Sequence, residues 1–173
     1  MNFYSTFPEQ PYHKTSVEMG EAVAALKQFP VSKAVKIACY IIFRNESGNG
    51  KSGVNNNYCG FQADSARWPI ELDKYITGGT SKKENMTGKN RLFLTFANVS
   101  GSLAFLIDRI QSRGLFVGGH CDVIVDMDIE DPKDWALCYW RSWVTGSKSA
   151  KIPKDELQGL LSMYRQGDKF FSH

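Results

Sequence analysis

The chain has 173 residues, the size of one ordinary domain, and 42% of them are hydrophobic, so a sizeable core can form. The formal net charge of +3 is too small to indicate a nucleic-acid partner. Four cysteines in no metal-ligand spacing argue against zinc, and three widely separated histidines argue against a histidine-based catalytic site. The sequence implies no metal or cofactor.

The N-terminal part of the chain predicts an irregular segment followed by a helix. Residues 1–15 contain Pro8 and Pro11, which interrupt any helix there. The range Val17–Gln28 is typical of a helix with Ser16 as its cap. Neither the basic start and apolar core of a signal peptide nor a membrane span is visible in the sequence, so we expect synthesis in the cytoplasm.

A second helix is predicted to begin after Ser32. Its apolar residues recur at helical spacing on a broad face, which indicates a buried, central helix; they are Ala34, Val35, Ile37, Ala38, Ile41 and Ile42. Glu46 falls at the C-terminal end of this helix, and Gly48 is a natural terminator.

Gly, Asn, Ser, Thr and Lys dominate residues 47–90, which favours loops and short strands. Residues 58–63 and 91–98 are predicted as strands, and a helix containing Leu103 and Ile110 is expected to end at Gly114.

Two more helices are predicted in the last third of the chain. Asp131 and Pro132 begin the first of them, and Gly146 ends it. The second begins near Pro153. We therefore expect a single α+β domain over residues 1–173, mainly α, with a helical core and a small polar β or loop lobe beside a cleft.

Glu46 is the strongest candidate for chemistry. A carboxylate at a helix C-terminus faces the negative end of the helix dipole, which disfavours its charged form. A glycosidase needs a protonated carboxyl group as its general acid. The Gly- and Asn-rich stretch that follows would let backbone groups approach a sugar chain closely.

The segment ESGNGKSGVNNNYCGFQAD resembles the signature of the glucosaminidase family of peptidoglycan hydrolases (glycoside hydrolase family 73), which includes flagellar-rod muramidases and autolysins. Its first part matches at Glu46, Ser47, Gly48, Gly50, Lys51 and Ser52, and its second at Asn56, Asn57, Gly60 and Phe61. A later family motif matches at Phe93, Phe96 and Ser102. The resemblance implies a lysozyme-like fold and an N-acetylglucosaminidase cleaving β-1,4 bonds, with Glu46 as general acid.

A second carboxylate is expected in the polar lobe, where the candidates are Asp64, Glu71, Asp73 and Glu84. Glu84 is favoured by its spacing from Glu46 and by its place in a Gly- and Lys-rich loop that would suit a mobile lid, and Asp64 is the runner-up. The remaining candidate residues would bind the sugar chain; they are Ser47, Asn57, Tyr58, Gly60, Phe61, Gln62, Trp68, Trp135 and Tyr139.

Two other functions stay open. Cys59 stands where the family has an aromatic residue and Gln62 where it has Lys, and Gly60-Phe61-Gln62 is closer to the Gly-Leu-x-Gln of lytic transglycosylases, which need one acid. The other alternative is an inactive lysozyme-like module that binds wall or protein.

An enzyme that cuts peptidoglycan would reach the wall as a type VI secretion effector, with a cognate immunity protein, or as a phage lysin.

Overall fold

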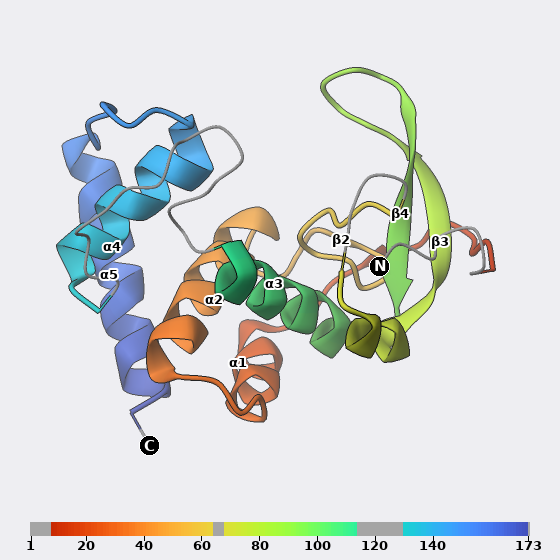
Figure 1. Cartoon of the computed structure of the whole chain (residues 1–173), viewed down its shortest axis with the longest axis horizontal. Coiled ribbons are helices and arrows are strands. Elements are labelled where there is room, and N and C mark those ends of the chain that lie inside the picture. The colour runs from red at the N-terminus through yellow and green to blue at the C-terminus, as the bar shows by residue number, and fades with distance from the viewer. Residues whose placement is uncertain (1–7, 64–67, 114–129, 173) are drawn as a thin grey trace. The chain divides into compact units, whose positions relative to one another are not determined.

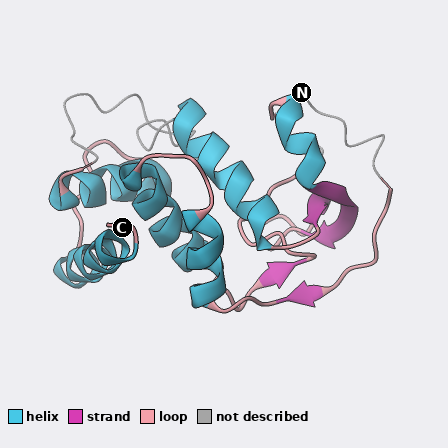
Figure 2. Cartoon of the chain, turned by 90° about the horizontal axis from the view of Figure 1, so that it is seen from below, coloured by secondary structure: helices cyan, strands magenta, loops and turns pink. Residues whose placement is uncertain are grey.

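The computed structural model describes residues 8–63, 68–113 and 130–172. About half of these residues are helical, and their strands form two small antiparallel pairs (Figure 2). The predicted α+β, mainly α class is therefore confirmed. The chain divides into two compact units: Met1–Phe29 with Ile42–Asp108, and Pro30–Ile41 with Arg109–His173. No described helix has both the length and the apolar character needed to span a membrane.

Helix α1 (Met19–Lys27) of the first unit is shorter than the predicted helix and lacks the predicted Ser16 cap. The residue before it, Glu18, is extended and caps nothing with its side chain. The Val17 N–H donates to the Gly50 carbonyl at 2.8 Å, which ties the residues before the helix to a distant loop.

Helix α2 (Lys33–Glu46) agrees with its prediction at both ends. The Val35 N–H donates to the Ser32 hydroxyl at 3.3 Å, which confirms the predicted cap. All seven residues from Ile37 to Phe43 are buried, as expected for a central helix. At the other end Gly48 is left-handed, with φ +56°, and confirms the predicted terminator.

Strands β3 (Ile76–Lys83) and β4 (Asn90–Phe96) form the larger sheet, a hairpin, while β1 (Lys14–Thr15) and β2 (Gly53–Val54) form the smaller one (Figure 1). The predicted strand at residues 91–98 is confirmed as β4. The predicted strand at residues 58–63 is wrong, because that segment contributes only one isolated bridge, Gln62 to Phe93.

Neighbouring segments cover both edges of the hairpin at its inner end. On the β3 edge, the Gly79 N–H donates to the Pro8 carbonyl at 3.0 Å. On the β4 edge, the Ala63 N–H donates to the Leu92 carbonyl at 2.7 Å. These bonds fix the inner half of the hairpin within the first unit.

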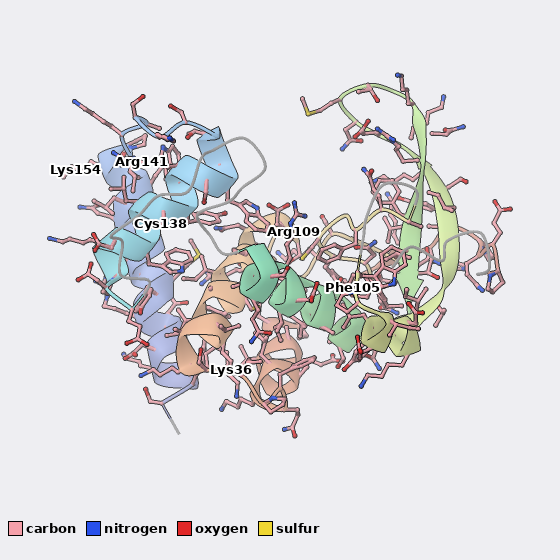
Figure 3. The ribbon with its side chains drawn as sticks, in the orientation of Figure 1. Lys36, Phe105, Arg109, Cys138, Arg141 and Lys154 are labelled. Carbon is pink, nitrogen blue, oxygen red and sulfur yellow. The ribbon has the colours of Figure 1, made fainter. Side chains whose placement is uncertain are left out.

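A short 3₁₀ helix, η2 (Ile70–Tyr75), and helix α3 (Val99–Arg113) complete the first core. Phe105 of α3 (Figure 3) contacts three aromatic rings, those of Phe61, Trp68 and Phe96, with centroids 5.1–5.7 Å apart. The predicted stop of this helix at Gly114 lies outside the described residues.

The second unit contains α4 (Pro132–Tyr139), a π-helical turn η3 (Trp140–Thr145) and α5 (Lys154–Phe170). The Asp131 carboxylate accepts from two N–H groups of the first turn of α4, as the Asp-Pro pair predicts. Gly146 is left-handed, with φ +64°, and ends η3 as predicted. Pro153 precedes α5, also as predicted.

Candidate functional site

Glu46 is the last residue of α2 and is exposed to solvent. The next residue, Ser47, is completely buried. The Asn49 N–H donates to the Arg44 carbonyl at 2.9 Å, which is the six-to-one bond of a Schellman motif. A defined capping turn therefore holds the end of the helix and presents the Glu46 side chain on the surface.

The turn after Glu46 is unusual because three consecutive residues are left-handed: Gly48 at φ +56°, Asn49 at +59° and Gly50 at +81°. Only glycine and, to a lesser degree, Asn and Asp adopt this conformation at low cost. The Arg44 side chain donates to the Asn49 side chain at 2.7 Å and supports the turn from the helix. The Gly-Asn-Gly sequence is thus required by the backbone.

Ser47 completes the turn from inside. Its hydroxyl donates to the Phe43 carbonyl at 2.6 Å and accepts from the Gly50 N–H at 2.8 Å. Both hydrogen-bonding roles of the hydroxyl are therefore used within the protein. The structure places Ser47 as a support for the Glu46 turn and not at a surface where it would bind a sugar.

The Asn-rich segment forms a second fixed loop. Asn57 is buried; its amide nitrogen donates to the carbonyls of Phe61 at 2.8 Å and Leu94 at 2.9 Å, and its amide oxygen accepts from the Phe61 N–H at 3.1 Å. All three bonds go to the backbone. Asn57 is therefore another supporting residue, and its side chain is not displayed to a ligand.

The segments that carry the family resemblance pack directly against one another. The side-chain amide of Asn56 donates to the Phe96 carbonyl at 3.0 Å, and the backbone N–H of Tyr58 donates to the Ser102 hydroxyl at 2.7 Å. The Ser102 hydroxyl in turn donates to the Asn56 carbonyl at 3.1 Å. Ser102, which sequence reasoning only matched to a motif, is thus the link between the Asn-rich loop and α3.

Three aromatic residues predicted to bind sugars lie in the core instead. Tyr58, Phe61 and Trp68 are 3%, 7% and 3% exposed. The ring of Tyr58 packs against that of Phe43, and the Trp68 indole N–H donates to Asp73 at 2.7 Å. Burial raises the pKa of Tyr58 above its ordinary value, and a hydrogen bond with Thr15 offsets part of this rise. In these positions the rings cannot stack on a sugar.

Trp135 and Tyr139 belong to the second unit and are also buried, at 0% and 4% exposure. Their rings stack on each other at 5.2 Å. They form core packing there, which is the reason their faces are not available to a ligand. Of the predicted sugar-binding residues, Gly60 is exposed and Gln62 is half-buried, so these two can meet a ligand at the surface.

Glu84 is the first residue of the turn between β3 and β4. Its carboxylate accepts from the Thr87 hydroxyl at 2.6 Å and lies 3.8 Å from Nε of Arg91. Its N–H donates to the Lys89 carbonyl at 2.8 Å, so backbone bonds close the turn. The expected mobile Gly- and Lys-rich loop is a hydrogen-bonded turn, and Arg91 is a neighbour that the sequence did not reveal. Asp64, the runner-up, lies outside the described residues.

Comparisons with protein-family models, with curated proteins and with solved structures gave no match to this chain. In the described ranges, no three or more His, Cys, Asp or Glu side chains come together as metal ligands would. The described parts of the candidate site that could carry chemistry are Glu46 with its turn and the β3–β4 turn.

Proposed function

We propose that the protein is a hydrolase of peptidoglycan glycan strands, an N-acetylglucosaminidase with Glu46 as its general acid. The observation that carries this proposal is an exposed carboxylate at the end of a buried helix, held by a turn that uses the Ser and both Gly residues of the resembled motif. A reactive carboxyl needs this combination of access to substrate and a fixed position.

In the proposed reaction, Glu46 protonates the glycosidic oxygen as the bond to the leaving sugar breaks. Glu84 would serve as the second carboxylate, oriented by Thr87 and Arg91. Among the predicted sugar-binding residues, the exposed Gly60 and the half-buried Gln62 would contact the sugar chain.

A specific observation favours a lytic transglycosylase as the second candidate. That mechanism needs one acid, and the carboxylate of Glu84 is already engaged by a hydroxyl and approached by a guanidinium within its own hairpin. The Gly60-Phe61-Gln62 sequence supports the same alternative. The two reactions share Glu46 and differ in their products.

We further propose that the enzyme acts on the wall after delivery, by a secretion machine or by phage lysis. A secretion effector would require a cognate immunity protein in its producer. Co-expression in the periplasm with the product of a neighbouring gene tests this part. A neighbour that prevents lysis and also inhibits digestion of purified wall supports it, and the absence of any such neighbour favours the phage origin.

Mass spectrometry of the fragments released from purified peptidoglycan tests the reaction. Reducing-end N-acetylglucosamine supports the glucosaminidase, and anhydro-muramic ends would show a transglycosylase. Glu46→Gln serves as the negative control, because amidation removes the acidic proton without changing size. If the unmodified protein releases no fragment, the proposed function is wrong and the binding module is the better account.

A further inference from the structure

The outer half of the β3–β4 hairpin concentrates the basic charge of the protein. Residues 76–96 contain four basic side chains and one acidic one, a net charge of +3 that equals the formal charge of the whole chain; they are Lys82, Lys83, Lys89 and Arg91, against Glu84. The remainder of the chain is therefore neutral overall. Figure 1 shows the turn of this hairpin extending beyond the labelled helices and strands of its unit.

An apolar side chain lies at the tip of this basic hairpin. Met86 is 95% exposed, more than any other large hydrophobic residue recorded for the described chain. Asn85, Thr87, Gly88 and Lys89 beside it are also exposed. Met86 at the end of the turn therefore contributes nothing to the core, and its flexible apolar side chain is available to a ligand or partner.

The cations surround the tip on both faces of the hairpin. Lys82 pairs with Arg91 across the strands, while Lys83 pairs with Asn90, and neighbouring residues of a strand point to opposite faces. The Lys82 amine lies 5.9 Å from the centroid of the Phe93 ring, on the first of these faces. A partner that covered one face would miss the cations of the other, but a surface approached by the tip would meet both sets and Met86.

From this arrangement we propose that the β3–β4 tip binds the surface of an anionic lipid bilayer, with Met86 in the headgroup region and the surrounding cations against lipid phosphates. Met86 distinguishes a bilayer from a purely polar anionic polymer, since only the bilayer offers an apolar layer beneath its charges. This inference concerns attachment and is compatible with the one-acid reaction at Glu46. A tip held in headgroups would keep Glu84, two residues from Met86, away from a glycan strand, so lipid binding argues against Glu84 as the second carboxylate.

The pairing of the hairpin allows such an approach. Among the described residues, the backbone bonds from the flanking segments reach Gly79 on β3 and Leu92 on β4. Beyond these residues the turn is closed by its own bonds, including Gly88 N–H to the Glu84 carbonyl at 2.8 Å. The tip is therefore a self-supported structure that can enter a headgroup layer without opening the core.

Co-sedimentation of the full chain with vesicles tests the proposal, using phosphatidylcholine alone or mixed with phosphatidylglycerol. We expect binding to the mixed vesicles only, and weaker binding at higher salt. Met86→Ser should weaken it by about tenfold. The double variant Lys83→Gln/Lys89→Gln should weaken it by about 25-fold, since each cation near such a surface contributes about fivefold.

Matched controls separate the tip from general charge and hydrophobicity. Ile70→Ser removes another exposed apolar residue, 57% exposed, from the same unit. Lys151→Gln/Lys154→Gln removes the same charge from exposed positions at the start of α5; Lys154 is labelled in Figure 3. Both controls should bind the mixed vesicles as the unmodified protein does.

Three results would overturn the proposal. The first is failure to bind mixed vesicles at low salt. The second is binding that Met86→Ser leaves unchanged, which would show simple adsorption of charge. The third is binding of soluble polyglutamate as tight as binding of the vesicles, which would show a site for an acidic polymer or protein.

Discussion

The backbone of Gly50 lies directly against the backbone of Val17. The Val17 N–H donates to the Gly50 carbonyl at 2.8 Å, and a Cβ added to Gly50 would stand 2.1 Å from the Val17 carbonyl oxygen. This contact ties the turn after Glu46 to the segment that leads into α1. It leaves no space for a side chain at position 50.

Gly50→Ala should therefore destabilise the protein. The substitution adds a clash with a backbone atom to the strain of a left-handed alanine, so we expect the free energy of unfolding to fall by about 2 kcal/mol or more. Chemical denaturation measures this loss. Gly159→Ala is the matched control, because Gly159 lies in α5 with no atom within 4 Å of the added Cβ. It should stabilise by about 0.5–1 kcal/mol, and equal effects of the two substitutions would contradict the contact.

Asn57→Ala should be costly for a different reason. It removes all three side-chain hydrogen bonds. The Phe61 N–H loses its acceptor and the Leu94 carbonyl loses the Asn57 donor, while the Phe61 carbonyl keeps the Leu94 N–H. We expect a loss of about 2–4 kcal/mol in the free energy of unfolding. Asn85→Ala, on the exposed β3–β4 turn, should stay within about 0.5 kcal/mol. A near-neutral Asn57→Ala would refute the supporting role.

The elements that the sequence predicts well are those whose signals are local. The Ser32 cap, the Asp131-Pro132 start and the left-handed Gly48 and Gly146 each act within one helical turn. Local hydrogen bonds and backbone conformation are enough to specify them. The same locality explains why Glu46 could be placed at the end of α2.

Strand β3 was not foreseen because its requirements come from distant residues. Its sequence, ITGGTSKK, lacks an alternating apolar pattern and contains two glycines. A Cβ at Gly78 would stand 2.2 Å from the Pro8 carbonyl oxygen, so the glycine is there to admit the N-terminal segment. That segment is some 70 residues away in sequence, and no window-based pattern contains this information.

The roles of the motif residues were the least predictable part of the site. Polar residues in a Gly-rich stretch indicate ligand contacts, yet Ser47 and Asn57 are buried and bond to the backbone. The aromatic Tyr58 and Phe61 fill the core, because their large apolar area favours burial. These motif residues therefore determine the local fold and do not contact a ligand directly.

The Cys138 thiol should give the stability a distinct pH dependence. Burial, followed by the nearby charge of Asp134, raises its pKa from an ordinary 9.0 to about 11. Below pH 9 the thiol is protonated in both the folded and unfolded states, so its contribution is fully present. As the pH rises toward 11 the unfolded chain loses this proton first, and stability falls.

Since one pKa unit corresponds to about 1.4 kcal/mol, the total loss from Cys138 should approach about 3 kcal/mol. The measurement is the free energy of unfolding at several pH values between 9 and 11. Cys138→Ala removes this titration while leaving all other groups in place, so the variant should show a shallower decline. Parallel curves for the two proteins would rule out the effect.

Glu84→Gln decides between one-acid and two-acid chemistry. If Glu84 is the second carboxylate of a glucosaminidase, turnover on purified wall should fall by about 10²-fold or more. Loss of the contact with Arg91 should change stability by less than about 1 kcal/mol, since that pair is partly exposed. Activity lost in Asp64→Asn but kept in Glu84→Gln would assign the role to Asp64. Activity kept in both variants would favour the transglycosylase.

Glu46→Gln is the sharpest test of the catalytic proposal. Glu46 is exposed at the end of α2, so amidation should change the free energy of unfolding by less than about 0.5 kcal/mol. Loss of the acidic proton should lower turnover by about 10²–10⁴-fold, as is typical of general acid catalysis. Release of soluble fragments from purified peptidoglycan measures activity, and thermal unfolding checks the fold. Glu156→Gln, at an exposed carboxylate in the first turn of α5, should keep full activity. A Glu46→Gln variant as active as Glu156→Gln would remove Glu46 from the mechanism, whatever the enzyme does to the wall.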